Sequence, residues 1–287
     1  MIYDCFTFFN ELDLLEIRLN ILKDSVDRFV LVEATKTHQG KAKPLYFLEQ
    51  KSRYLNFLDK IIHVIVDEYP DYEGRPALVL ERHQRNMILN GLASCRPDDV
   101  ILISDVDEIP EPRKVRQFKD RPGIKMFKQR MFYYYLNCMN VAHAGAYRWN
   151  GTAMVNYADL SKPHDFRTLR IALLGLNHDR FIHRIYRNVW KWLNLDLMGK
   201  RVVFVPDGGW HFSFLGGVEA IIEKIEAFSH TEYNTPEFKN AEKIREAIHR
   251  GTDIFGRDFS YACVPQDGNL PDYIVRNRDK YRHLIKN

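Results

Sequence analysis

Residues 100–110 read Val100-Ile101-Leu102-Ile103-Ser104-Asp105-Val106-Asp107-Glu108-Ile109-Pro110. The first four residues are aliphatic, which is typical of a strand covered on both faces. The strand leads directly into three carboxylates within four positions. In open α/β sheets, ligands bind beyond the carboxyl ends of the strands. This stretch therefore predicts an α/β fold and places a candidate site at the end of one strand.

The first two-fifths of the chain alternate between strand-like and helix-like patterns. Leu12, Leu15, Leu19 and Leu22 recur at helical spacing. Alternation of this kind predicts a mainly parallel central sheet flanked by helices. The other apolar runs of strand length are residues 2–6, 29–32, 61–66 and 202–205, and the other helix-compatible stretches are 51–59 and 78–94.

The middle of the chain differs from this pattern. Residues 124–160 are rich in aromatic side chains and carry few helix signals, so we expect antiparallel strands and loops there. An amphipathic helix is predicted from Val218 to Phe228, and the polar tail is expected to wrap the surface. The economical division is one domain over residues 1–287, with parts 1–123, 124–230 and 231–287.

Composition excludes several classes of protein. The 287 residues include 45% apolar and 28% charged side chains and carry a net charge of +4, without the basic stripe of a nucleic-acid binder. A mildly basic surface suits a small anionic substrate. The four cysteines are far apart and form no CxxC pair, so we expect free thiols and neither a zinc site nor a disulfide framework.

The sequence carries no recognisable targeting signal. No apolar run has the length of a membrane span, and the first residues lack the pattern of a signal peptide. We therefore expect a cytoplasmic protein.

The acidic turn is a candidate metal site. Its carboxylates repel one another unless a cation or a basic partner neutralises them. Mg²⁺ and Mn²⁺ usually bind one or two carboxylates together with substrate phosphates, so Asp105 and Asp107 are predicted to bridge a metal and a diphosphate. The alternative is a solvated acidic turn that caps the next helix.

Two further clusters have the chemistry of the same site. Arg82 and Arg85 are three residues apart on a predicted helix, and guanidinium groups grip phosphates, although a solvated face with Glu81 is the alternative. His211 follows a strand and the Gly208-Gly209 turn, where the backbone can bend sharply, and it is predicted to be a third metal ligand.

Four blocks of sequence, in this order, resemble glycosyltransferase family 17. They are residues 10–19 (NELDLLEIRL), Val32-Glu33 with Lys43-Pro44-Leu45, residues 96–110 with the acidic turn, and residues 209–213 (GWHFS). The resemblance implies a GT-A-type nucleotide-binding fold. It also implies an irregular, aromatic-rich half on the acceptor side, and an inverting transfer from a UDP-sugar, most simply of N-acetylglucosamine, to a glycan hydroxyl.

The resemblance also implies roles for single residues. Asp105 would face the ribose or the metal, Asp107 would bind Mn²⁺ or Mg²⁺, and His211 would be an additional ligand. The remaining donor-binding candidates are Phe6, Thr7, Glu33, Arg82, Arg85, Asn86 and Trp210.

An inverting transfer needs a base that takes the proton of the acceptor hydroxyl. Asp207, which opens the glycine turn, is the first candidate, and Glu108 and Glu219 are the alternatives. Each also has a structural interpretation: Asp207 as a turn residue, Glu108 as a helix cap, and Glu219 as an acid matched to a helix dipole. Trp149 and Asn150 are the pair predicted to meet the acceptor.

Two other functions compete with sugar transfer. A sugar nucleotidyltransferase would carry a glycine-rich basic loop after the first strand, and residues 6–11 (FTFFNE) differ from that. A non-catalytic glycan- or nucleotide-sugar-binding protein on the same fold is the second alternative. The sequence does not disclose the acceptor or the oligomeric state.

Overall fold

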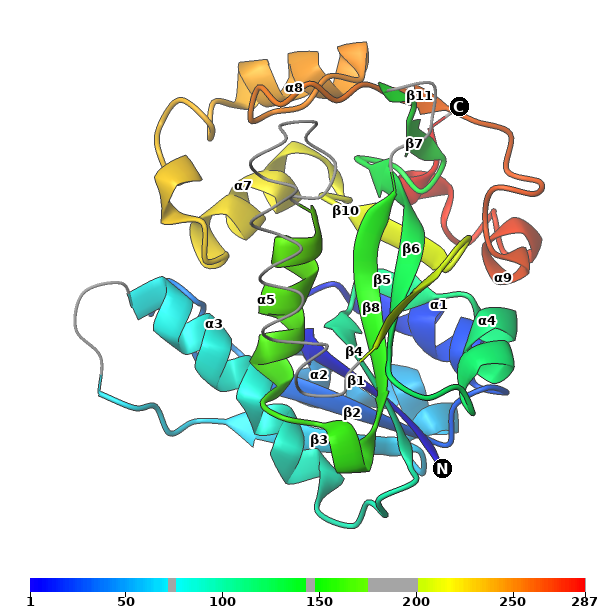
Figure 1. Ribbon diagram of the computed structural model, residues 1–287. Coiled ribbons are helices and arrows are strands. Elements are labelled where there is room, and N and C mark those ends of the chain that lie inside the picture. Colours follow the sequence, from blue (N-terminus) through cyan, green and yellow to red (C-terminus); the bar gives the residue numbers. More distant parts are fainter. Residues whose placement is uncertain (72–75, 143–147, 175–200, 287) are drawn as a thin grey trace, which may run out of the picture.

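A computed structural model describes residues 1–71, 76–142, 148–174 and 201–286 (Figure 1). Within these ranges, strands form an 11-stranded sheet whose main path runs β11-β7-β6-β8-β4-β1-β2-β3. The strands of its parallel end are β1 (Ile2–Phe8), β2 (Arg28–Ala34), β3 (Ile61–Val66) and β4 (Val100–Asp105). The mixed part consists of β5 (Glu108–Pro110), β6 (Ile124–Tyr133), β7 (Cys138–Asn140), β8 (Trp149–Asn156), β9 (Val202–Val205), β10 (Gly209–Ser213) and β11 (Tyr261–Cys263).

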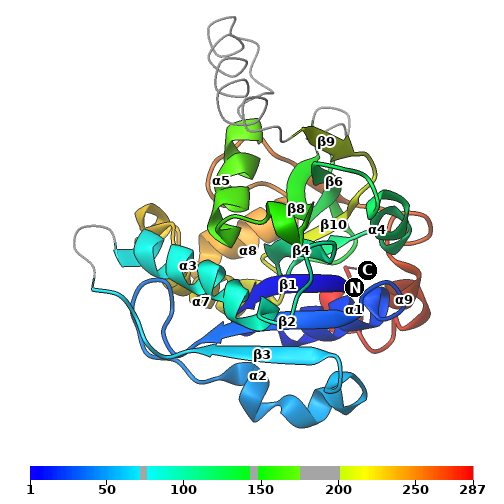
Figure 2. The same cartoon turned by 60° about the horizontal axis from the view of Figure 1, so that its bottom comes forward.

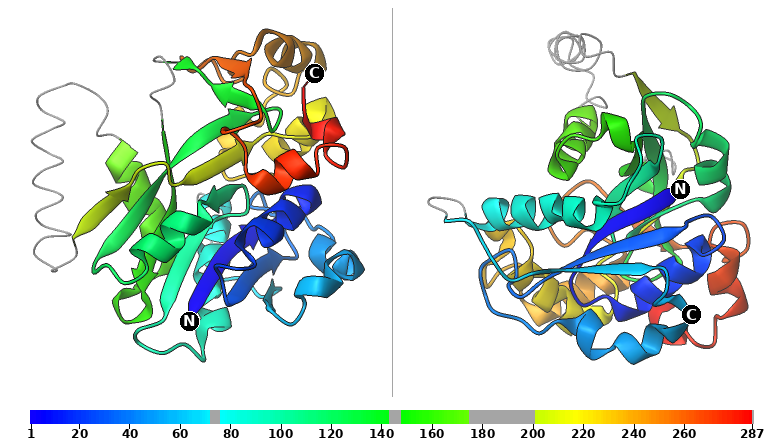
Figure 3. Two further views of the ribbon diagram at one scale, coloured as in Figure 1. Left: turned by 90° about the vertical axis from the view of Figure 1, so that its right-hand side faces the viewer. Right: turned by 90° about the horizontal axis from the view of Figure 1, so that it is seen from below.

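Helices cover both faces of the parallel end. The longer ones are α1 (Leu12–Leu22), α3 (Pro76–Asn86), α5 (Pro163–Leu174), α7 (Gly217–Ala227) and α8 (Ala241–Arg250); α2 (Tyr46–Glu49), α4 (Pro112–Phe118) and α9 (Asp272–Arg276) are short. The 3₁₀ helices are Lys51–Phe57, Met87–Leu92, Tyr157–Asp159, Thr231–Tyr233 and Arg282–Leu284. Figures 2 and 3 show α3 and α5 on one side of β1 and β2, with α1 and α9 on the other.

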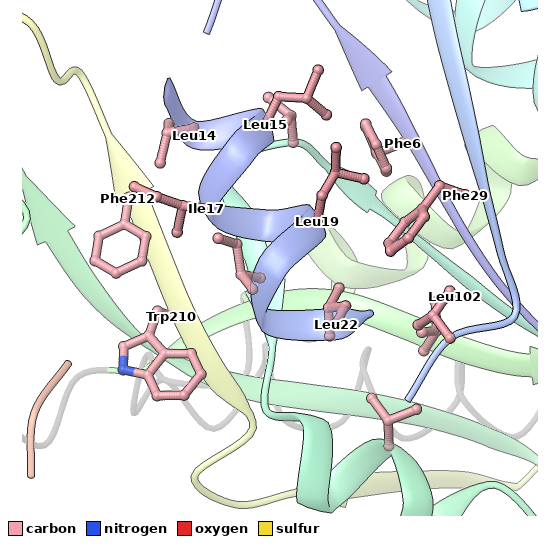
Figure 4. Close-up of a cluster of buried hydrophobic side chains, with 14 of the residues drawn as sticks. Phe6, Leu14, Leu15, Ile17, Leu19, Leu22, Phe29, Leu102, Trp210 and Phe212 are labelled. Carbon is pink, nitrogen blue, oxygen red and sulfur yellow. The ribbon is translucent and has the colours of Figure 1, made fainter. Parts of the chain in front are cut away.

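Alternation along the strands builds two separate cores. Phe6 and Phe8 of β1 face α1, whereas Tyr3 and Cys5 face the opposite layer. In Figure 4, leucines of α1 point toward Phe6 and the neighbouring strands. Because both faces are covered, the apolar residues of β1, β2 and β4 are buried except Ile2, as parallel strands require.

The prediction of a mainly parallel sheet is wrong. β4, β1, β2 and β3 are parallel, but β8 lies antiparallel between β4 and β6, and the sheet as a whole is mixed. A parallel neighbour needs a long crossover connection, usually a helix. Between β6 and β8, the described residues contain the short strand β7 and no α-helix, which leaves antiparallel pairing as the available arrangement.

β10 brings His211 next to the acidic turn by pairing with both β5 and β6. It runs parallel to β6 and antiparallel to β5, and this register sets His211 opposite Glu108. The acidic turn between β4 and β5 therefore lies beside residues more than 100 positions later in the chain. No helix within the described ranges is long and apolar enough to cross a membrane.

Candidate active site

The acidic turn is held from beneath by Arg18. This arginine of α1 is completely buried, and its Nη1 donates to the carbonyl oxygens of Asp105, Val106 and Glu108 at 3.0, 3.2 and 2.9 Å. Its other nitrogens donate to Asp4 at 2.8 and 2.6 Å and to Ser104 Oγ at 2.6 Å. One guanidinium thus satisfies the turn's carbonyl groups and fixes the direction of its side chains.

Asp105 lies at the end of β4 between two arginines. Arg85 Nη2 donates to Asp105 Oδ1 at 2.7 Å, and Arg167 Nη1 lies 2.6 Å from Asp105 Oδ2. Thr7 at the end of β1 adds a 3.3 Å hydrogen bond. Burial lowers the pKa of Arg85, but Asp105 and Glu81 outweigh that effect and raise it above its usual range. Arg85 therefore remains cationic beside the cavity.

Asp107 is almost completely buried and is paired with Lys224 of α7. Lys224 Nζ donates to Asp107 Oδ2 at 3.0 Å, and His211 Nε2 lies 3.7 Å from the same oxygen. Burial raises the pKa of Asp107, but Lys224 and His211 more than offset it and hold that pKa well below its usual range. The carboxylate is therefore ionised at any physiological pH.

His211 is stacked on Trp149. Their ring centroids are 4.7 Å apart with an interplanar angle of 21°. Trp149 Nε1 donates to Glu108 Oε1 at 2.7 Å, Arg167 Nη1 lies 3.1 Å from the same oxygen, and Glu108 Oε2 accepts from the Asp105 amide. Glu108 is 1% exposed and braces its own turn.

These groups line one cavity of about 280 Å³. It opens beyond the carboxyl ends of β1 and β4, as the topology predicts for an α/β sheet. Its charged lining is mixed in sign. The acidic side chains are Glu11, Glu81, Asp105, Asp107 and Glu108, and the lysines and arginines are Lys36, Lys43, Arg85, Arg167, Lys224 and Arg257. Its aromatic lining is formed by Phe8, Phe9, Tyr133, Trp149, Phe214, Phe228, Tyr233 and Phe255.

Several predicted donor-binding residues lie elsewhere. Phe6 is in the core below the Arg18 guanidinium, and Glu33 is buried against the Phe47 amide and His63. Arg82 is exposed on α3 and lies outside the cavity lining. Of the two arginines on this helix, Arg85 therefore lines the cavity and Arg82 faces solvent.

Asn86 and Trp210 have structural contacts outside the cavity lining. Asn86 Oδ1 accepts from the His164 amide at the start of α5, at 3.0 Å. Trp210 points to the opposite face of β10 from His211, and its Nε1 donates to the Asn269 carbonyl at 2.7 Å. Of the predicted donor-binding residues, Thr7, Arg85 and Asp105 line the cavity.

Among the three predicted bases, Glu108 lines the cavity. Asp207 is exposed in the turn between β9 and β10 with φ of 47°, and Glu219 is exposed in the first turn of α7. Both lie outside the cavity lining. The predicted acceptor pair is also divided, because Trp149 lines the cavity whereas Asn150 is completely buried.

Sequence reasoning missed the basic partners of the turn. Arg18 lies in the leucine-rich helix α1. A charged residue on the apolar face of this helix is the one feature of the sequence that could have indicated its role. Lys224 and Arg167 lie on helices that carry several other charged residues, so the sequence does not single them out. Only the packing of α5 and α7 against the turn brings them to the carboxylates.

The carboxylates fit one requirement of a hard divalent cation. Asp105 and Asp107 supply oxygen atoms at the cavity, and Mg²⁺ or Mn²⁺ commonly uses one or two carboxylates plus substrate phosphates. No three histidine, cysteine or carboxylate side chains converge on one point within the described ranges. Among the described residues, the buried Nδ1 of His211 has no hydrogen-bond partner, whereas a metal-bound histidine usually donates from its second nitrogen.

The model of "Glycosyltransferase family 17" matches residues 1–165. Enzymes called beta-1,4-mannosyl-glycoprotein 4-beta-N-acetylglucosaminyltransferase from Rattus norvegicus and Mus musculus are 22% identical over 97% of this chain, and each match covers 53% of the relative. The Homo sapiens enzyme of that name is 33% identical over 107 residues, which is 35% of this chain and 20% of that enzyme.

The chain thus spans about half the length of the curated relatives it matches. Among solved structures, the mannosyltransferase PcManGT from Pyrobaculum calidifontis, in complex with GDP-Man and Mn²⁺, aligns with a TM-score of 0.40 and 12% identity. That alignment covers 86% of this chain and 69% of the mannosyltransferase.

Proposed function

The chain belongs to glycosyltransferase family 17, and from this premise we propose that it transfers N-acetylglucosamine from a UDP-sugar to a glycan hydroxyl with inversion. The observation that carries the proposal is the meeting of Asp105, Asp107, Arg85 and Lys224 in one cavity at the carboxyl ends of β1 and β4. Paired carboxylates surrounded by fixed cations suit a nucleotide diphosphate with its counter-ion. A GT-A-type fold is part of the same proposal.

The donor diphosphate is proposed to lie beside Arg85 and Arg167. Both guanidinium groups already have fixed orientations through Asp105. A guanidinium can contact a carboxylate and a phosphate at once because it has five N–H donors. Fixed donors of this kind stabilise charge that develops on a leaving group.

Asp107 and Asp105 would hold Mn²⁺ or Mg²⁺ together with the diphosphate. When bound, the cation supplies charge neutralisation for the departing nucleoside diphosphate. Lys224 is proposed to neutralise Asp107 before the donor arrives, since its ammonium group contacts that carboxylate at 3.0 Å.

The acceptor is proposed to enter beside the aromatic wall formed by Tyr133, Phe214, Tyr233 and Phe255. Apolar faces of sugars pack well on such rings, and the remaining cavity edge is polar. Glu108 is the predicted base that lines this cavity, and we retain it as the proposed proton acceptor.

The test is a panel of UDP-sugars with Mn²⁺, read by melting temperature and by transfer to a glycan array. Asp107→Asn should abolish the shift caused by UDP with Mn²⁺, and Asp207→Asn is the matched control because Asp207 is exposed and outside the cavity. NMR of the product's anomeric proton tests inversion. Absence of any shift with UDP-sugars at high concentration contradicts the proposal.

The base is tested separately. Glu108→Gln should lower kcat while UDP affinity persists, whereas Glu219→Gln should leave kcat unchanged. If the two variants have equal rates, Glu108 is not the base.

A further inference from the structure

Cys138 and Cys263 are 125 positions apart in the chain and directly opposite each other in the sheet. Cys138 is in β7 and Cys263 is in β11, and these strands are antiparallel neighbours. All four cysteines of the structure are thiols. The other two, Cys5 and Cys95, lie on a different layer, near β1.

The pairing register places the two cysteines at a non-hydrogen-bonded position. Val264 N donates to the Asn137 carbonyl at 2.9 Å on one side, and Val141 N donates to the Ser260 carbonyl at 2.8 Å on the other. Because hydrogen-bonded and non-hydrogen-bonded pairs alternate, Cys138 and Cys263 fall on a non-hydrogen-bonded pair. In such pairs the Cα atoms are typically ~4.5 Å apart, within the range that a disulfide spans.

The environments of the two thiols differ. Cys138 is 1% exposed, whereas Cys263 is open to solvent at the end of β11. Burial and, to a lesser extent, the adjacent Cys263 thiol raise the pKa of Cys138 to about 11. An oxidant in solution therefore meets Cys263 first.

We propose that Cys138 and Cys263 form a cross-strand disulfide when the protein meets a low-molecular-weight disulfide such as oxidised glutathione. The Cys263 thiolate attacks one glutathione sulfur, which forms a mixed disulfide and releases one glutathione. The Cys138 thiolate then attacks Cys263 Sγ and releases the second glutathione. Two protein thiols are oxidised and one glutathione disulfide is reduced to two thiols.

The bond would act on the wall of the candidate site. Residues 251–260 connect α8 to β11 and carry Phe255 and Arg257, which line the cavity. β11 is three residues long and its partner β7 is equally short. A covalent link between them anchors this connection to the strand that follows Tyr133, so the oxidised protein has a more rigid acceptor-side wall.

The experiment uses the full chain incubated with oxidised or reduced glutathione, then alkylated without reduction and mapped by mass spectrometry. We expect a peptide linked through Cys138 and Cys263 and the loss of two titratable thiols. Cys95→Ser should still form this link, and Cys263→Ser should not. A stable glutathione adduct on Cys263 with an intact Cys138 thiol overturns the proposal.

Hydrogen exchange tests the effect on the wall. Amides of residues 251–260 should exchange several-fold more slowly in the oxidised protein, and dithiothreitol should reverse the change. Equal exchange in both forms would show that the link does not rigidify the wall. Neither measurement depends on glycosyltransferase activity, so failure of the proposed donor or acceptor leaves this inference intact.

Discussion

Arg18 and Asp4 form a bidentate ion pair in which both side chains are completely buried, directly beneath the acidic turn. The same guanidinium reaches three carbonyl groups of that turn. The pair therefore links β1, α1 and the β4–β5 connection into one unit. The geometry of the candidate site therefore depends on Arg18, although Arg18 does not line the cavity.

Arg18→Lys should destabilise the protein by ~3 kcal/mol. A lysine has a single ammonium group in place of the guanidinium, so Asp4 and the turn carbonyls would lose hydrogen-bond donors. Urea unfolding measures this. Arg245→Lys is the matched control, since Arg245 forms an exposed pair with Glu242 and should change stability by less than ~1 kcal/mol. Similar losses in the two variants would mean that Arg18 does not organise the turn.

Trp149→Phe should keep the stack on His211 but remove the hydrogen bond to Glu108. We expect a loss of ~1–2 kcal/mol in stability and weaker binding of UDP with Mn²⁺, because a buried carboxylate loses a donor beside the turn. Trp210→Phe also removes an indole hydrogen bond but lies outside the cavity lining. It should lower stability without changing UDP affinity, and calorimetry separates the two.

Lys224→Met should tighten the binding of Mn²⁺ in the absence of nucleotide. The ammonium group contacts Asp107 and would compete with a cation for it. An increase on the order of tenfold corresponds to ~1.4 kcal/mol. Lys224→Arg keeps the charge and should show no increase. Unchanged Mn²⁺ affinity in Lys224→Met would indicate that the cation binds elsewhere.

Glu81 should contribute to acid sensitivity. Burial raises the pKa of its carboxyl, but Arg85 and His38 outweigh burial and lower that pKa from 4.5 to about 2. Because the folded-state pKa is depressed, the stabilisation is fully present above pH 4.5 and is lost as the pH falls toward 2.

Glu81→Gln should therefore flatten the dependence of the unfolding free energy on pH in this window, by up to ~3 kcal/mol. Glu242→Gln, at an exposed position, should leave the dependence unchanged. Parallel pH profiles for the wild type and Glu81→Gln would contradict the assignment.

Local pattern was sufficient for the four parallel strands β1 to β4 and for the position of the turn. The strand-like runs at residues 2–6, 29–32, 61–66 and 100–103 all lie within these strands, and the acidic turn lies at the end of β4 as predicted. Residues 78–94 were less regular than their pattern suggests. The α-helix ends at Asn86 and a 3₁₀ helix continues from Met87 to Leu92.

Tertiary structure alone decided which charges meet. The sequence by itself determined that three carboxylates follow a buried strand, since side-chain periodicity is a local property. It did not determine that Arg167 and Lys224 pair with two of them, that Arg18 lies beneath the turn, or that β8, one of the expected antiparallel strands, lies between β4 and β6. Those outcomes depend on how distant elements pack, and burial of a charge is favourable only when its partner arrives with it.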